Sequence, residues 1–144
     1  MSGARWGRAW GLGMLTAAVA ACGPPAGALV TQCTNEPLGL RDPWACAVSS
    51  ERMEVERAAA FQLNPYWSRV DVTADFATEA GTATVTIDQL PGQAWTLAPS
   101  APLHLALTVP FDRGLKGFML RVQPTAGPLE RLTGTLHYQG RESS

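Results

Sequence analysis

From Arg69 onward, apolar residues occupy every second position between short turns, and this alternation constrains the fold more than any other feature of the chain. Alternation of this kind is typical of antiparallel strands that bury one face. In the segment RVDVTADF, for example, Val70, Val72, Ala74 and Phe76 alternate with more polar residues. The same pattern predicts six strands, at residues 69–76, 82–88, 94–98, 103–109, 117–123 and 131–139.

The segments between these strands are short and rich in turn-forming residues. They lie at Glu79–Gly81, Leu90–Gln93, Pro99–Pro102, Asp112–Gly114 and Pro124–Pro128. Parallel strands need a crossover of a dozen or more residues, which none of these connections supplies. We therefore expect a mainly β domain, an antiparallel six-stranded sandwich or partly closed barrel.

The stretch before the strands, residues 50–63, predicts one N-terminal helix that would cover the open side of the sheet. Ser50 can act as its N-cap, Glu51 and Glu54 lie in the first turn, the run Ala58–Ala60 has high helix propensity, and Asn64-Pro65 ends it. Residues 53–57 also fit a short strand, because Met53 and Val55 alternate with glutamates.

The first 21 residues have the order of a secretory signal peptide. The segment MSGARWGR carries two arginines and no acid, and thirteen uncharged residues follow it. A transmembrane helix needs about twenty apolar residues. Because Gly23-Pro24-Pro25 ends the apolar run early, we expect export rather than a permanent span.

The end of this signal, Val19-Ala20-Ala21-Cys22, resembles the lipobox of bacterial lipoproteins. The resemblance covers only residues 1–22, and Val19 stands where leucine is commonest. It implies cleavage before Cys22 and attachment of diacylglycerol to its thiol, with acyl chains such as palmitate. The chain then divides into a signal peptide (1–21), a flexible tether (22–30), one domain with a disulfide loop (31–140) and a frayed tail (141–144).

An ordinary signal-peptidase site is the alternative, because Ala26-Gly27-Ala28 is an A-x-A sequence just after the prolines. Cleavage there would discard Cys22 and release a soluble secreted protein. Cleavage at either site would place the domain outside the cytoplasm. Cleavage before Cys22 would anchor the domain to a membrane, where it would face the periplasm or the exterior.

The two remaining cysteines, Cys33 and Cys46, predict a disulfide in an oxidising compartment. It would close a loop of fourteen residues and contribute about 3 kcal/mol by loop entropy. A metal or redox pair is less favoured, because the spacing is not C-x-x-C and no histidine is nearby.

Charge excludes nucleic acid as a partner. After Cys22 the chain has nine basic and twelve acidic residues, the arginines are scattered, and Lys116 is the only lysine. The same composition gives no electrostatic attraction to anionic lipid, so any membrane contact would depend on the acyl chains.

Few residues suggest chemistry, and we predict no catalytic residue and no cofactor. His104 and His137 lie at outward positions of their strands and could form a sparse copper site with Asp112 or Met119. Ser68 and Ser100 lack the G-x-S-x-G context of a hydrolase nucleophile.

Two tryptophans outside the predicted strands, Trp44 and Trp67, are candidate binding residues. Both would equally serve to close the end of a small sandwich. Overall, the sequence favours a non-catalytic envelope lipoprotein that presents loops or a sheet edge to a ligand or another envelope protein. The alternative is an exported copper carrier or small enzyme that uses His104 and His137.

Overall fold

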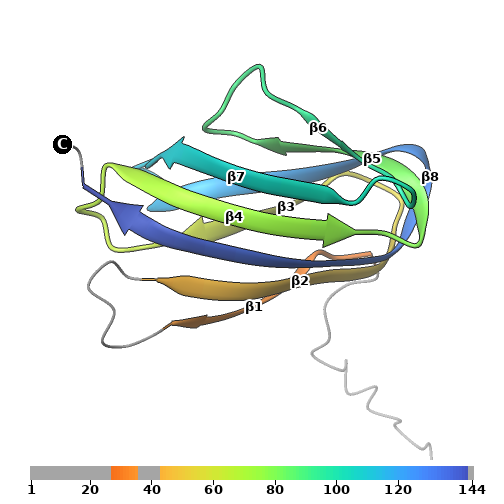
Figure 1. Cartoon of the computed structure of the whole chain (residues 1–144), viewed down its shortest axis with the longest axis horizontal. Coiled ribbons are helices and arrows are strands. Elements are labelled where there is room, and N and C mark those ends of the chain that lie inside the picture. Colours follow the sequence, from red (N-terminus) through yellow and green to blue (C-terminus); the bar gives the residue numbers. More distant parts are fainter. Residues whose placement is uncertain (1–26, 36–42, 143–144) are drawn as a thin grey trace, which may run out of the picture.

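The computed structural model describes residues 27–35 and 43–142, which form eight antiparallel strands (Figure 1). The strands are β1 (Val30–Asn35), β2 (Trp44–Met53), β3 (Arg57–Gln62), β4 (Arg69–Ala77), β5 (Ala80–Ile87), β6 (Trp95–Leu97), β7 (Leu103–Pro110) and β8 (Gly117–Arg141). No helix in the described part of the chain is long and apolar enough to cross a membrane. Residues 1–26, which include the predicted signal peptide and Cys22, lie outside the described residues.

The centre of the fold is a three-stranded ribbon that bends back on itself. β8 runs for 25 residues and pairs along one edge with β2 and then β3, and along the other with β4 and then β5. Only residues 54–56 separate β2 from β3, and only residues 78–79 separate β4 from β5. The β2–β3 segment, the β4–β5 segment and β8 therefore all bend at the same position along the ribbon.

The bend depends on backbone conformations that strand residues do not ordinarily adopt. Gly81 and Gly127 have φ angles of 81° and 72°, in the left-handed region that glycine enters without a steric cost. A Cβ on Gly81 would lie 2.3 Å from the Pro128 carbonyl oxygen, so the two strands approach closely here. The buried Thr78 hydroxyl bonds to the carbonyls of Ala80 and Glu130 and ties the bend together.

Bending produces two layers, so the fold is an open sandwich rather than a closed barrel. One layer has the strand order β1-β2-β8-β4-β7, and the other has β3-β8-β5-β6. Between the layers, Phe61 of β3 stacks on Phe118, and Tyr138 meets both rings edge-on. Because β8 is shared, β3 lies over β2 and β5 lies over β4, which leaves β1 as an extra strand at the margin (Figure 1).

The predicted alternation is confirmed. Val70, Val72, Ala74 and Phe76 are at most 2 % exposed, whereas Thr73 and Asp75 point outward. All six predicted segments lie mainly within strands. The last two, however, are halves of the single strand β8, because Pro124–Pro128 is part of the bend and not a hairpin turn.

The predicted helix at residues 50–63 is wrong. Residues 50–53 complete β2 and residues 57–62 form β3, so the domain has eight strands instead of six. Ala58, Ala59 and Ala60 each pair with β8, and Phe61 is inserted into the core at 2 % exposure. Pairing with a long neighbouring strand outweighs the helix propensity of three alanines, which amounts to only tenths of a kcal/mol per residue.

The predicted disulfide is confirmed. Cys33 and Cys46 are directly opposite each other on β1 and β2, with Cα atoms 4.0 Å apart and sulfurs bonded. Cys46 is buried, while Cys33 is exposed on the marginal strand. The bond therefore attaches β1, the first strand of the described chain, to the body of the sandwich.

Candidate functional site

The outer face of the layer β1-β2-β8-β4-β7 carries both histidines that the sequence singled out. Its register places His137 beside Thr73, and two residues further along β4 it places Asp75 between His104 and Thr135. Alanine and threonine occupy the positions around the two histidines, and their small side chains leave this face nearly flat. Both histidines are exposed, as their outward positions predicted.

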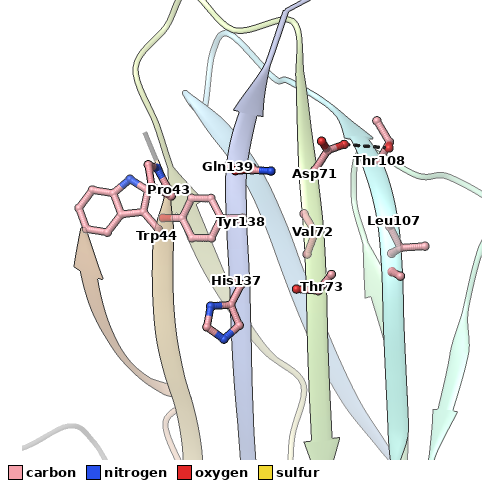
Figure 2. Close-up of a pocket in the computed structure, with 11 residues that line it drawn as sticks. Pro43, Trp44, Asp71, Val72, Thr73, Leu107, Thr108, His137, Tyr138 and Gln139 are labelled. Carbon is pink, nitrogen blue, oxygen red and sulfur yellow. Dashed lines mark hydrogen bonds between the residues drawn. The ribbon is translucent and has the colours of Figure 1, made fainter. Parts of the chain in front are cut away.

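A shallow hollow of about 520 Å³ lies on this face at the end where β8 finishes (Figure 2). β4 and β8 provide its floor, β7 one side, and the start of β2 the other. Its lining residues are Pro43, Trp44, Asp71, Val72, Thr73, Ala106, Leu107, Thr108, His137, Tyr138 and Gln139.

Within the hollow, the Asp71 carboxylate already has partners, whereas three other polar side chains have none in the described part of the chain. The Thr108 hydroxyl donates a hydrogen bond to Asp71 at 3.0 Å, and the Arg141 guanidinium lies 3.6 Å from the same carboxylate. In the described part of the chain, the side chains of Thr73, His137 and Gln139 form no hydrogen bond. The hollow therefore offers a hydroxyl, an imidazole and an amide that a ligand could contact.

A second hollow of about 380 Å³ follows the first along β4 and β8. On its rim, Nδ1 of His104 lies 2.6 Å from an Asp75 carboxylate oxygen, and both side chains are about two-thirds exposed. The remaining lining residues are Phe76, Ala77, Pro102, Leu103, Thr133, Gly134 and Thr135. Both hollows include residues of β7, the last strand of this layer.

The two histidines do not form a compact metal site. β4 lies between their strands, and their register positions differ by two residues, so their Cα atoms are roughly 12 Å apart by standard strand spacings. Among residues 27–35 and 43–142, no three His, Cys, Asp or Glu side chains are grouped as metal ligands.

The other residues considered as ligands lie elsewhere. Met119 is on β8 in the opposite layer, and Asp112 stabilises the turn between β7 and β8. The Asp112 carboxylate accepts hydrogen bonds from the Leu115 and Gly114 backbone N–H groups and from Gln89. These bonds, that of Leu115 first, lower the pKa of Asp112 below its ordinary value.

Both candidate tryptophans pack mainly against the hydrophobic core and cover its end. Trp67 is 5 % exposed, and its ring lies directly over Gly140, where any Cβ would come within 2.2 Å of it. Trp44 pairs with Tyr138, whose side chain faces inward, and the two rings stack 6.3 Å apart. Figure 2 shows these rings together at the left, away from Asp71 and Thr108.

Sequence reasoning identified two residues of the first hollow, Trp44 and His137, and missed most of the others. Asp71, Thr73, Thr108 and Gln139 occupy the outward positions that alternation predicts, but any of them could equally have been ordinary solvated residues. What brings them together is the strand order β8-β4-β7, which joins segments about seventy residues apart. Ser68 donates its hydroxyl hydrogen bond to the Arg141 carbonyl, and Ser100 lies in the turn between β6 and β7.

Comparison with known proteins gives only a distant likeness. No protein-family profile matches the chain, and no curated protein matches it. Among solved structures, the chain is similar to the cupin domain of Cnp3 from Schizosaccharomyces pombe, with a TM-score of 0.39 and 10 % sequence identity. The match covers 78 % of this chain and 68 % of that one, and no functional conclusion follows from it.

Proposed function

We propose that this protein is an exported, lipid-anchored binding module without catalytic activity. The observation that carries the proposal is the sequence Val19-Ala20-Ala21-Cys22 at the end of a signal-like segment, followed by a short tether. The tether leads into β1, at the margin of a disulfide-linked sandwich. A disulfide is expected where proteins are exported, which supports the same location.

The position of the tether gives the module an orientation. β1 begins at Val30, opposite Ser49, and ends at Asn35, opposite Trp44. The first hollow lies at the Trp44 end, about 17 Å along the strand from the point where the tether enters. An anchor at Cys22 would therefore hold the entry end toward the membrane and present the hollow away from it.

The Cys22→Ser variant should lose membrane attachment and keep its fold. The thioether anchor requires the thiol, while all eight strands of the described sandwich follow Cys22 in the sequence. Fractionation of cells should move the protein out of the detergent-soluble membrane pool, and circular dichroism should show an unchanged melting temperature. A Cys33→Ser variant is the matched control, because it loses a different cysteine and should stay with the membrane.

Mass spectrometry of the protein from native membranes provides the direct test. A diacylated peptide that begins at Cys22 supports the proposal. An unmodified peptide that begins at Leu29 would instead mean cleavage after Ala28 and a soluble secreted protein.

Copper carriage is the competing proposal, because His104 and His137 are both exposed on one face and imidazole binds copper well. If the module is a non-metal binder, micromolar copper should leave the NMR signals of the two imidazoles separate and largely unbroadened. Simultaneous broadening of both rings, lost in a His137→Ala variant, would favour the copper carrier. An Asp75→Asn variant tests whether Asp75, the partner of His104, takes part.

A further inference from the structure

We infer that β7 is a dimerisation edge, at which the five-stranded layer continues into the same layer of a second copy. β7 pairs with β4 on one side only, so the other side of its backbone has no strand partner in the described part of the chain. This inference goes beyond the proposed function and does not depend on whether Cys22 is lipidated.

The hydrogen-bond pattern shows which residues face the open edge. Phe111 donates its N–H to the Ser68 carbonyl, so odd-numbered residues of β7 direct their backbone groups toward β4. The even-numbered residues His104, Ala106 and Thr108 therefore direct theirs outward. Unpaired edge groups of this kind are a ready template for another strand.

The sequence of β7 is complementary to itself in one antiparallel register. With a two-fold axis at Ala106, His104 faces Thr108 of the second copy and Leu105 faces Leu107. Apolar residues then meet apolar residues, polar residues meet polar ones, and no like charges are opposed. Pro102 and Pro110, which lack an N–H, face each other in this register and end the pairing symmetrically.

The core is also incomplete along this side of the sandwich. β6, the neighbouring strand of the other layer, has only three residues, while β7 has eight. Several large apolar side chains here are only partly buried against the core: Leu90, Trp95, Leu103, Leu107 and Phe111. A second copy at β7 would cover part of this surface, which adds hydrophobic burial to backbone pairing.

The exposed edge of β3 serves as an internal comparison. β3 also pairs on one side only, and the Leu63 N–H bonded to the Lys116 carbonyl shows that Ala58 and Ala60 face its open edge. Tyr138 already donates a hydrogen bond to the Gln62 carbonyl there. β1 projects beyond β3 in the facing layer, so two copies that met at β3 would bring their β1 strands into collision.

The test compares two matched proline variants of the purified full-length protein in detergent. Ala106→Pro and Ala60→Pro each remove an outward N–H from an exposed alanine on an edge strand, which a folded monomer tolerates. Sedimentation should show a dimer for the native protein. Ala106→Pro should weaken the dimer about tenfold or more, and Ala60→Pro should leave it unchanged.

Cysteine cross-linking gives a second readout if a proline variant fails to fold. Opposed Cα atoms at a hydrogen-bonded pair are about 5.5 Å apart, within disulfide range. Ala106→Cys should therefore form a covalent dimer on mild oxidation, whereas Ala58→Cys should not. A monomer at every concentration tested, or a dimer that persists in Ala106→Pro and does not cross-link at position 106, would overturn the inference.

Discussion

Replacing Phe118 with alanine is expected to lower the free energy of unfolding by about 3–5 kcal/mol. Phe118 is 0 % exposed and lies 5.2 Å from the Phe61 ring and 5.5 Å from the Tyr138 ring, measured between centroids. These three side chains join β3 and both halves of β8, so the substitution leaves a cavity at the contact between the layers. Urea denaturation followed by circular dichroism measures the change.

Tyr66→Ala is the matched control for this prediction. Tyr66 is 69 % exposed, and it contacts Trp67 at the surface, with the ring centroids 4.9 Å apart. Its removal should cost less than about 1 kcal/mol. Equal losses in the two variants would mean that the aromatic cluster does not hold the layers together as described.

The strands from Arg69 onward were predictable because each buries one face only. A side-chain period of two leaves a direct record in the sequence wherever one face is core and the other is solvent. Val85 and Ile87, for example, are at most 2 % exposed, while Thr84 and Thr86, which alternate with them, are not buried. This part of the fold therefore followed from local pattern alone.

The helix prediction at residues 50–63 failed because its evidence was also local. An N-cap serine, early glutamates and an alanine run describe what the segment would favour in isolation. In the folded chain, Ser50 is buried within β2 and the alanines pair with β8. The partner residues on β8 that decide the outcome lie about sixty residues further along the chain, and local propensity does not contain that information.

The bend of β8 was missed for a related reason. Pro124, Gly127 and Pro128 have the composition of a turn, and turn residues most often mark a reversal of direction. Here Gly127 and the left-handed Arg131, with φ of 49°, bend a strand that continues. A bulge and a turn use the same residue types, so only the registers of β4 and β5 on β8 distinguish them.

The candidate site was predictable only as a list of outward residues. His104 and His137 were assigned to the solvent face correctly, but their strands proved not to be neighbours, because β4 lies between them. The hollow depends on strand order, which short antiparallel connections leave open. Asp71, Thr73 and Gln139 therefore emerged as lining residues only from the topology.

Removing the disulfide with the double substitution Cys33→Ala and Cys46→Ala should lower the free energy of unfolding by about 3 kcal/mol. The loop that the bond closes is short, and loop entropy in the unfolded chain sets this magnitude. Dithiothreitol should lower the melting temperature of the native protein and leave that of the double variant unchanged. Cys22 does not confound the comparison, because both proteins retain it.

The loss should be concentrated at β1, because little else holds that strand. Within residues 27–35 and 43–142, β1 pairs with β2 alone and no strand of the other layer faces it, and its central residues Thr31–Thr34 are exposed. Hydrogen exchange should therefore become fast in β1 while β4 and β8 stay protected. Slow exchange in β1 of the double variant would show that strand pairing alone fixes it. The tether would then join the sandwich at a strand that does not need the covalent bond.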